Sequence, residues 1–199
     1  MRNTQDDYTR QRGFSLIELL VTMAIAVILL TIGVPSFIDM MSSNTAASYG
    51  NDLLTDLNYA RSEAITRGVT VTVCHSNVAA TCSGTWSDGW IVFANTNTAG
   101  TDNVVDPGDE MLRTHAMVNT SGWALNANNV TDYVTYKNSG LSNQAVIFVF
   151  CKGNVLNVGN QTRSAAVSVN QTGRAHVLPY NANGVPLDDT GNALATCTP

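Results

Sequence analysis

The fold is decided by the stretch Arg12-Gly13-Phe14-Ser15-Leu16-Ile17-Glu18-Leu19, which opens a long apolar run. The run from Phe14 to Val34 contains 21 residues, and Glu18 is its only charged residue. A helix of that length rises about 31 Å, which matches the hydrocarbon core of a bilayer. A carboxylate in such a segment costs roughly 2.5–3.5 kcal/mol to insert, so its presence indicates a function.

The segment before the apolar run is basic, with three arginines against two aspartates. An ordinary secretory signal places a small-x-small cleavage site after an apolar core of 7–15 residues. No Ala-x-Ala site follows this run, and residues 35–41 continue in a helical style. We therefore expect the apolar segment to be retained as an anchor, with a cytoplasmic N-terminus by the positive-inside rule.

This N-terminal pattern resembles the signal of type IV pilins and type II secretion pseudopilins. The resemblance implies that residues 1–13 are a leader, which a prepilin peptidase removes between Gly13 and Phe14, and that Phe14 is then methylated. Glu18 would lie unpaired in lipid until the Phe14 ammonium of a neighbouring subunit pairs with it. Because two unpaired buried charges are costly, this pairing would favour adding subunits in register.

A second interpretation of the same residues is a capping box, in which Ser15 and Glu18 satisfy free N–H groups at a helix start. That pattern accounts for a glutamate in the first turn without any partner. The full string after a basic leader is far more specific than the capping box alone.

Residues 14–67 are predicted to form one long helix in two parts, a membrane-spanning half at 14–35 and an amphipathic half at 36–67. Gly33 and Pro35 should weaken it where it leaves the membrane, because proline removes a hydrogen bond. An apolar stripe then predicts one buried face, with polar positions between its members and Gly68 as C-cap. The stripe consists of Leu53, Leu57, Ala60 and Ala64, and the polar positions are Asp52, Asp56, Arg61, Glu63 and Arg67.

Residues 68–199 are predicted to form an antiparallel β domain. Their composition is rich in Asn, Thr, Val, Gly and Ser, which suits strands and turns. Trp90 and Phe93 are expected in its core, and the chain from Pro179 onward is turn-rich. Residues 86–93 are expected to be a turn that leads into a strand. The other expected strands lie near 69–74, 111–115, 133–136, 145–151, 165–169 and 175–178.

Four cysteines, Cys74, Cys82, Cys151 and Cys197, all follow the anchor. An even number in an oxidising compartment suggests two disulfides, for which three connectivities exist. Sequence proximity favours Cys74–Cys82 and Cys151–Cys197. A metal site with His75 is the alternative, but the spacing fits no common zinc pattern.

The β domain resembles the FimT/GspH group of minor pilins and pseudopilins through Gly89-Trp90-Ile91-Val92-Phe93, a late cysteine and a Gly-Arg-x-His turn. The resemblance implies an α+β, pilin-like fold, no enzymatic activity, no cofactor and no metal. It implies a bacterial inner-membrane protein with a periplasmic β domain that enters a pilus or pseudopilus. Its partners would be other pilins or pseudopilins, the prepilin peptidase, the inner-membrane assembly platform and membrane lipid. The favoured function is a FimT-like minor type IV pilin, and the alternative is a GspH-like pseudopilin of type II secretion.

FimT members carry a Gly-Arg-x-Arg motif implicated in DNA binding, so DNA is a further expected partner. Gly173 and Arg174 match this motif, but His176 replaces the second arginine, and histidine is mostly neutral near pH 7. Lys152 and Arg163 could add charge if the strands bring them close. The alternative without a binding function is a β-turn with a solvated arginine. The formal charge of −5, or −6 without the leader, is not the balance of a dedicated nucleic-acid binder.

Two further patterns are weak. The acidic loop residues could hold Ca²⁺, but they lack EF-hand spacing and a solvated turn is the better interpretation. The histidines fit no nucleophile or phosphate-loop motif, so we expect no catalysis. The residues concerned are Asp102, Asp106, Asp109 and Glu110 in the loop, and His75, His115 and His176.

Overall fold

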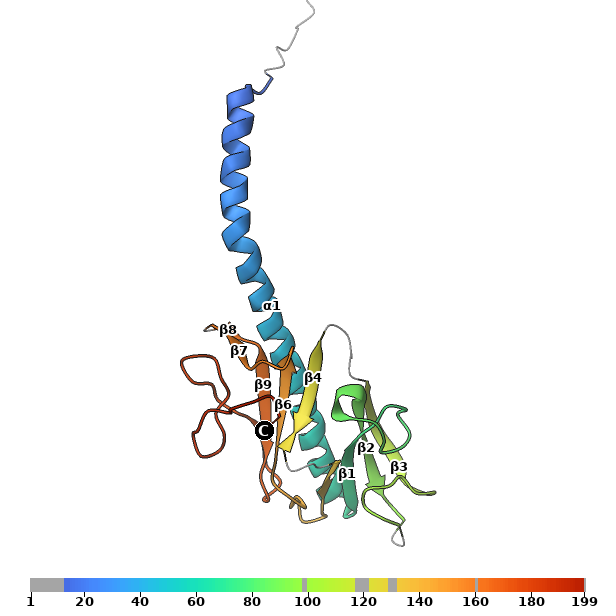
Figure 1. The fold of residues 1–199 in the computed structure, drawn as a ribbon. Helices are drawn as coiled ribbons and strands as arrows, with labels where there is room; N and C mark the ends of the chain where they lie inside the picture. Colours follow the sequence, from blue (N-terminus) through green and yellow to red (C-terminus); the bar gives the residue numbers. More distant parts are fainter. Residues whose placement is uncertain (1–12, 98–99, 117–121, 129–131, 160, 199) are drawn as a thin grey trace, which may run out of the picture. The chain divides into compact units, whose positions relative to one another are not determined.

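The computed structural model describes residues 13–97, 100–116, 122–128, 132–159 and 161–198 (Figure 1). The chain divides into two compact units, Met1–Ile38 and Asp39–Pro199. One helix, α1 (Leu16–Arg67), runs through both. The first unit contains the N-terminal part of α1, and the second contains the rest of α1 and all the strands found in the described residues.

In the first unit, α1 presents apolar side chains around its whole circumference, and every described residue there is exposed. A helix that is apolar on all sides belongs in a membrane or a protein core. It is also long and apolar enough to cross a membrane. The helix continues through Gly33 and Pro35 without interruption, so the expected weakening does not divide it. One proline removes a single backbone donor, and the neighbouring turns keep theirs.

The second unit contains two four-stranded antiparallel sheets and a two-stranded hairpin. The first sheet has the order β3-β2-β1-β5, and the second has the order β10-β9-β6-β4. A short 3-10 helix, η1 (Trp86–Asp88), precedes β2. The strands are β1 (Thr70–His75), β2 (Gly89–Asn95), β3 (Glu110–Ala116), β4 (Trp123–Ala127), β5 (Tyr133–Tyr136), β6 (Val146–Lys152), β7 (Asn157–Val158), β8 (Gln161–Thr162), β9 (Ser164–Val169) and β10 (Ala175–Val177).

The predicted strands are found within one to three residues, but β4 and the β7–β8 hairpin were not predicted. The sequence of β4 contains two alanines and an asparagine, which have low β-propensity. Its pairing with β6, from Trp123↔Lys152 to Ala127↔Phe148, creates the strand through a tertiary contact.

The predicted helical stripe packs in the core of the second unit. Leu53, Leu57, Ala60 and Ala64 are all fully buried. Burying each leucine contributes roughly 1.5–3 kcal/mol. Gly50 allows α1 to approach β9 closely, since a Cβ there would lie 3.1 Å from the Cβ of Ala165.

One residue that was predicted at a polar position of the helix, Asp56, is buried. It is only 6% exposed and lies on the side of α1 that contacts the first sheet. It accepts hydrogen bonds of 2.8 Å from Trp90 Nε1 and from Arg113 Nη1. The hydrogen bond to Asp56 raises the pKa of the Arg113 guanidinium, which also stacks on the ring of Tyr59. The helical pattern could not show this, because both partners come from distant strands.

The outer faces of the two sheets are also covered, and a disulfide lies in each cover. Cys74–Cys82 closes the loop after β1 and packs with Ile91 and Phe93. Cys151–Cys197 joins β6 to the C-terminal segment, which packs over the second sheet. This is the pairing that sequence proximity favours. Trp90 and Phe93 are both core residues, as predicted.

Replacing Asp56 by alanine should lower the free energy of unfolding by about 2 kcal/mol, because it leaves the buried Trp90 N–H without an acceptor and removes the ion pair of the part-exposed Arg113. Asp52→Ala, on the same helix but less buried, should change it by less than about 0.5 kcal/mol. Urea unfolding of the full chain in detergent measures both. Equal effects of the two variants would contradict a structural role for the Asp56 contacts.

Candidate functional site

Glu18 lies in the first turn of α1 on a surface that is otherwise apolar. The first helical hydrogen bond here runs from the Leu19 amide to the Ser15 carbonyl at 3.1 Å. Among the residues that the structure describes, neither the Ser15 hydroxyl nor the Glu18 carboxylate has a hydrogen-bond partner. The hydrogen bonds of a capping box are therefore not found among the described residues, and Glu18 has no cationic partner there.

Phe14 precedes the helix and its side chain is 77% exposed. A free amine at Phe14 would carry a positive charge near neutral pH. In a low-dielectric layer, an ammonium and a carboxylate that are each unpaired gain most by meeting. A carboxylate in such a layer is therefore suited to hold a cation of another molecule, without any covalent chemistry.

The four residues proposed for DNA contact do not form one basic patch. Lys152 and Arg163 are neighbours, since the Lys152 amide donates to the Arg163 carbonyl at 3.2 Å. Arg163 Nη2 pairs with Asp39 at 2.5 Å, and Lys152 Nζ lies 3.5 Å from Ser42 Oγ and over the Trp123 ring. Both cations are thus directed toward the start of the second unit's part of α1.

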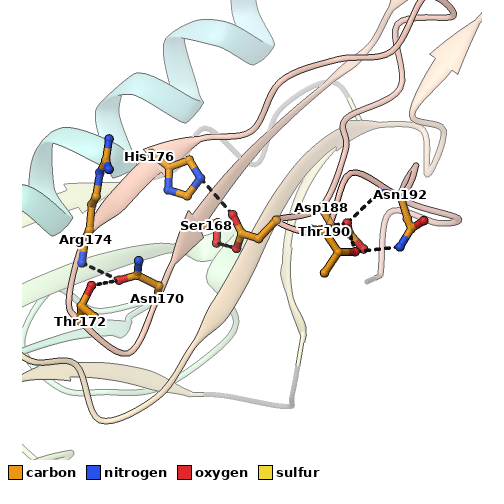
Figure 2. Close-up of polar contacts among 9 residues, drawn as sticks. Ser168, Asn170, Thr172, Arg174, His176, Asp188, Thr190 and Asn192 are labelled. Atoms are coloured by element: carbon orange, nitrogen blue, oxygen red, sulfur yellow. Dashed lines mark hydrogen bonds and ion pairs between the residues drawn. The ribbon is translucent and has the colours of Figure 1, made fainter.

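His176 lies in β10, where it faces a carboxylate of the C-terminal segment. Its Nε2 is 3.0 Å from Asp189 Oδ1, and the hydroxyl of Ser168 also donates to Asp189. The dashed line from His176 in Figure 2 marks this pair. Asp189 would neutralise a positive charge on His176. The second cationic position of the motif is therefore less able to bind phosphate here than an arginine would be.

Gly173 and Arg174 belong to a tight turn between β9 and β10. Asn170 Oδ1 accepts from the Arg174 amide at 3.0 Å and from the Thr172 hydroxyl at 2.6 Å, as Figure 2 shows. Gly173 has a φ of 78°, and a Cβ there would lie 1.9 Å from the Gly140 carbonyl oxygen. The glycine of the motif is thus required by packing, whereas the Arg174 side chain is exposed.

Sequence reasoning missed two cations next to this turn. Arg61 of α1 donates to the carbonyls of Gly140 at 3.0 Å and Thr172 at 3.1 Å, so it joins both turns to the helix. Lys137 is exposed and begins the turn that ends at Gly140. Within the described parts of the chain, neither of them nor Arg174 has a carboxylate partner. The three are far apart in the sequence, so only the fold could bring them together.

Two carboxylates of the acidic loop accept hydrogen bonds from backbone amides of the same loop. Asp109 accepts from the amides of Thr96 and Asp106, at 3.0 and 2.8 Å, and Asp106 accepts from the Thr101 amide at 3.1 Å. Glu110 instead pairs with Arg67. No group of three or more potential metal ligands occurs in the part of the chain that is described.

The other two histidines have structural contacts. His115 stacks on Trp90 with ring centroids 4.1 Å apart. His75 Nε2 lies 3.3 Å from Asp132, and its ring meets Trp86 edge-on. Neither contact includes a nucleophile.

A single long helix with an exposed apolar start, followed by a disulfide-bonded antiparallel β domain, defines the pilin-like class of proteins. The sequence model of the family described as Type II transport protein GspH matches residues 50–173, more than half of the chain. The chain therefore belongs to the GspH family, which comprises minor pilins and pseudopilins. A model of the prokaryotic N-terminal methylation motif matches residues 8–34.

Solved structures with this fold include the type IV minor pilin FimU of Pseudomonas aeruginosa in two crystal forms. In the P21 form, the TM-score is 0.54 at 18% identity, covering 77% of this chain and 96% of that one. The P65 form gives 0.52 at 17% identity, covering 76% and 98%. The minor pseudopilin EpsH of Vibrio cholerae gives a TM-score of 0.45 at 13% identity, covering 67% and 95%. No curated protein sequence matches significantly.

Gly173→Ala should destabilise the β domain more than Gly153→Ala. Both glycines have positive φ, at 78° and 64°, so each alanine carries a similar backbone strain of about 1 kcal/mol. Only at Gly173 does the new Cβ meet a backbone atom, the Gly140 carbonyl oxygen, and at Gly153 no atom lies within 4 Å. Thermal unfolding of the two full-length variants compares them, and equal melting temperatures would contradict the close contact.

Proposed function

We propose that this protein is a FimT-like minor pilin of a type IV pilus. The observation that carries assembly into a filament is the Glu18 carboxylate on the apolar part of α1, which has no partner among the described residues and follows a leader within the methylation motif. The likeness of the fold to the type IV minor pilin FimU favours a pilin over a pseudopilin. In this proposal residues 1–13 are the leader, 14–35 the anchor and assembly segment, 36–67 the amphipathic half of the helix, and 68–199 the β domain. The chain would be held in the bacterial inner membrane with its β domain in the periplasm.

Processing would create the group that Glu18 requires. A prepilin peptidase would cut between Gly13 and Phe14, and the new Phe14 amine would be methylated but would keep its positive charge. The amine of an incoming subunit would then meet Glu18 of its neighbour in the apolar layer. An assembly platform in the inner membrane would bring the subunits together, and the β domain would supply the surface that other pilins contact.

The alternative is a GspH-like pseudopilin of type II secretion, in which the same N-terminal chemistry builds a pseudopilus. The family includes both kinds of protein. Deleting the gene distinguishes them, since loss of pili with intact protein secretion supports the pilin and the reverse supports the pseudopilin.

Glu18→Ala should reduce incorporation into filaments by at least about tenfold, because it leaves the neighbour's ammonium unpaired in the apolar layer. Thr22→Ala, one turn further along α1, is the matched control, because the Thr22 hydroxyl donates to the Leu19 carbonyl of its own helix. Immunoblots of sheared filaments and of membranes measure incorporation.

N-terminal sequencing of the mature protein separates assembly from processing in this experiment. A start at N-methyl-Phe14 in both variants is expected. Normal incorporation of Glu18→Ala would refute the proposed assembly contact, and a start beyond residue 35 would refute the anchor.

DNA binding is a second candidate function, favoured by one observation. Arg174, Arg61 and Lys137 lie at adjoining turns without carboxylate partners among the described residues, whereas Arg67, Arg113 and Arg163 are ion-paired. We propose these three cations as the phosphate contacts, in place of the predicted set with His176, Lys152 and Arg163.

The full chain in detergent should slow the migration of duplex DNA in a gel at low salt. Arg174→Ala should lower the slope of log affinity against log salt concentration by about one phosphate contact. Arg67→Ala is the control, because Glu63 and Glu110 already neutralise that arginine. Absence of a shift at low salt, or equal effects of the two variants, would exclude this site.

A further inference from the structure

The C-terminal segment after residue 178 contains two carboxylates, Asp188 and Asp189, and no other charged side chain. The Asp188 carboxylate accepts hydrogen bonds from the Thr190 hydroxyl at 2.7 Å and from the amides of Thr190 and Asn192, both at 2.9 Å. These hydrogen bonds, above all that of the Thr190 hydroxyl, lower the pKa of Asp188 (Figure 2). Asp188 therefore builds the turn at 188–192, which we call the Asp189 turn after the residue that it presents to the sheet.

The Asp189 carboxylate directs both oxygens at the second sheet. Its Oδ1 lies 3.0 Å from His176 Nε2, and its Oδ2 accepts from the Ser168 hydroxyl. His176 of β10 is paired with Ser168 of β9. Their chain neighbours Ala175 and Val169 pack in the core against α1, so His176 and Ser168 lie on the outer face of this sheet. Two donors from two strands thus hold one carboxylate, and two oxygens of a phosphate would present them with the same acceptors.

Both donors suit an anion whether or not the imidazole is charged. His176 Nδ1 is buried and has no hydrogen-bond partner among the described residues. The proton of a neutral ring is therefore best placed on Nε2, where it points at the acceptor. A serine hydroxyl rotates to donate to whichever oxygen is present.

The contact that holds the Asp189 turn is weak. The side chains of His176 and Asp189 are 34% and 47% exposed, and ion pairs as exposed as this one add little stability. In the described parts of the chain, no hydrogen bond other than those of the Asp189 carboxylate joins residues 188–192 to a sheet. The turn can therefore open locally while the sheet stays folded.

The two covered donors adjoin an exposed cation. The Arg174 carbonyl accepts from the Asn170 amide at 3.2 Å, so the pairing of the two chain segments continues beyond β10. Arg174 lies two residues before His176, and alternation places both side chains on the same face. Figure 2 shows both at this edge of the sheet. Arg174, His176 and Ser168 could therefore contact one anionic ligand together.

We propose that Asp189 occupies a phosphate subsite formed by His176 and Ser168 beside Arg174, and that the Asp189 turn has to open before phosphate can enter. The inference rests on the DNA binding proposed above as the second function, and it adds the regulation of that site. In the free chain the Asp189 carboxylate satisfies both donors and repels an approaching phosphate. A phosphate of the DNA backbone replaces the carboxylate, and the turn opens.

Gel retardation of duplex DNA by the full chain in a maltoside detergent tests the inference at low salt. Asp189→Ala should raise the affinity at least about threefold, because it removes the competing acceptor together with its charge. Asp132→Ala is the matched control, because it also removes a carboxylate from a histidine, His75, at 3.3 Å. It should change the affinity by less than about 1.5-fold. In a His176→Gln background, Asp189→Ala should have no more effect than the control. Equal effects of Asp189→Ala and Asp132→Ala, or an undiminished gain without His176, overturn the proposal.

Inorganic phosphate separates this inference from DNA binding itself. In nitrogen-15 NMR spectra, phosphate should shift the ring signals of His176 more in Asp189→Ala than in the unmodified chain, and equal shifts overturn the proposal. A phosphate response in Asp189→Ala without DNA retardation supports the covered subsite and refutes DNA as the source of the phosphate. DNA retardation that Arg174→Ala weakens but Asp189→Ala leaves unchanged refutes only the covered subsite. Absence of any response to phosphate and to DNA, in every variant, refutes both.

Discussion

The structure depends on the burial of one stripe of α1 against two sheets. Small residues such as Ala46, Gly50, Ala60 and Ala64 allow the helix to approach the strands closely, and Leu53 and Leu57 fill the space between the sheets. The stripe belongs entirely to the second unit. The preceding part of the same helix has no such partner among the described residues, and it is apolar on every side.

That contrast explains how one helix can serve two environments. Where the stripe is buried, even a charge is tolerated, because Trp90 and Arg113 satisfy Asp56. At Glu18 the chain supplies no equivalent partner. A satisfied carboxylate stabilises the domain, and an unsatisfied one in an apolar surface favours contact with another molecule. In the proposed function the second carboxylate drives assembly, because only another subunit can complete it.

The basic residues show how the fold redistributes charge. Arg163 and His176 face Asp39 and Asp189, so two of the cations first considered for DNA are neutralised within the chain. Arg61 and Lys137, which no motif singled out, adjoin the turn that contains Arg174.

The sequence by itself determined the long helix, its buried stripe, most strands and the family, because each depends on local periodicity or on a contiguous motif. It also narrowed the disulfides to a favoured pairing through proximity alone. Only the tertiary structure decided that there are two sheets, that Ala-rich residues 123–127 form a strand, and that Asp56 is buried. The tertiary structure also decided that Arg61 and Lys137 adjoin the turn that contains Arg174. These features arise from contacts between residues distant in the chain, for which neither propensity nor spacing carries a signal.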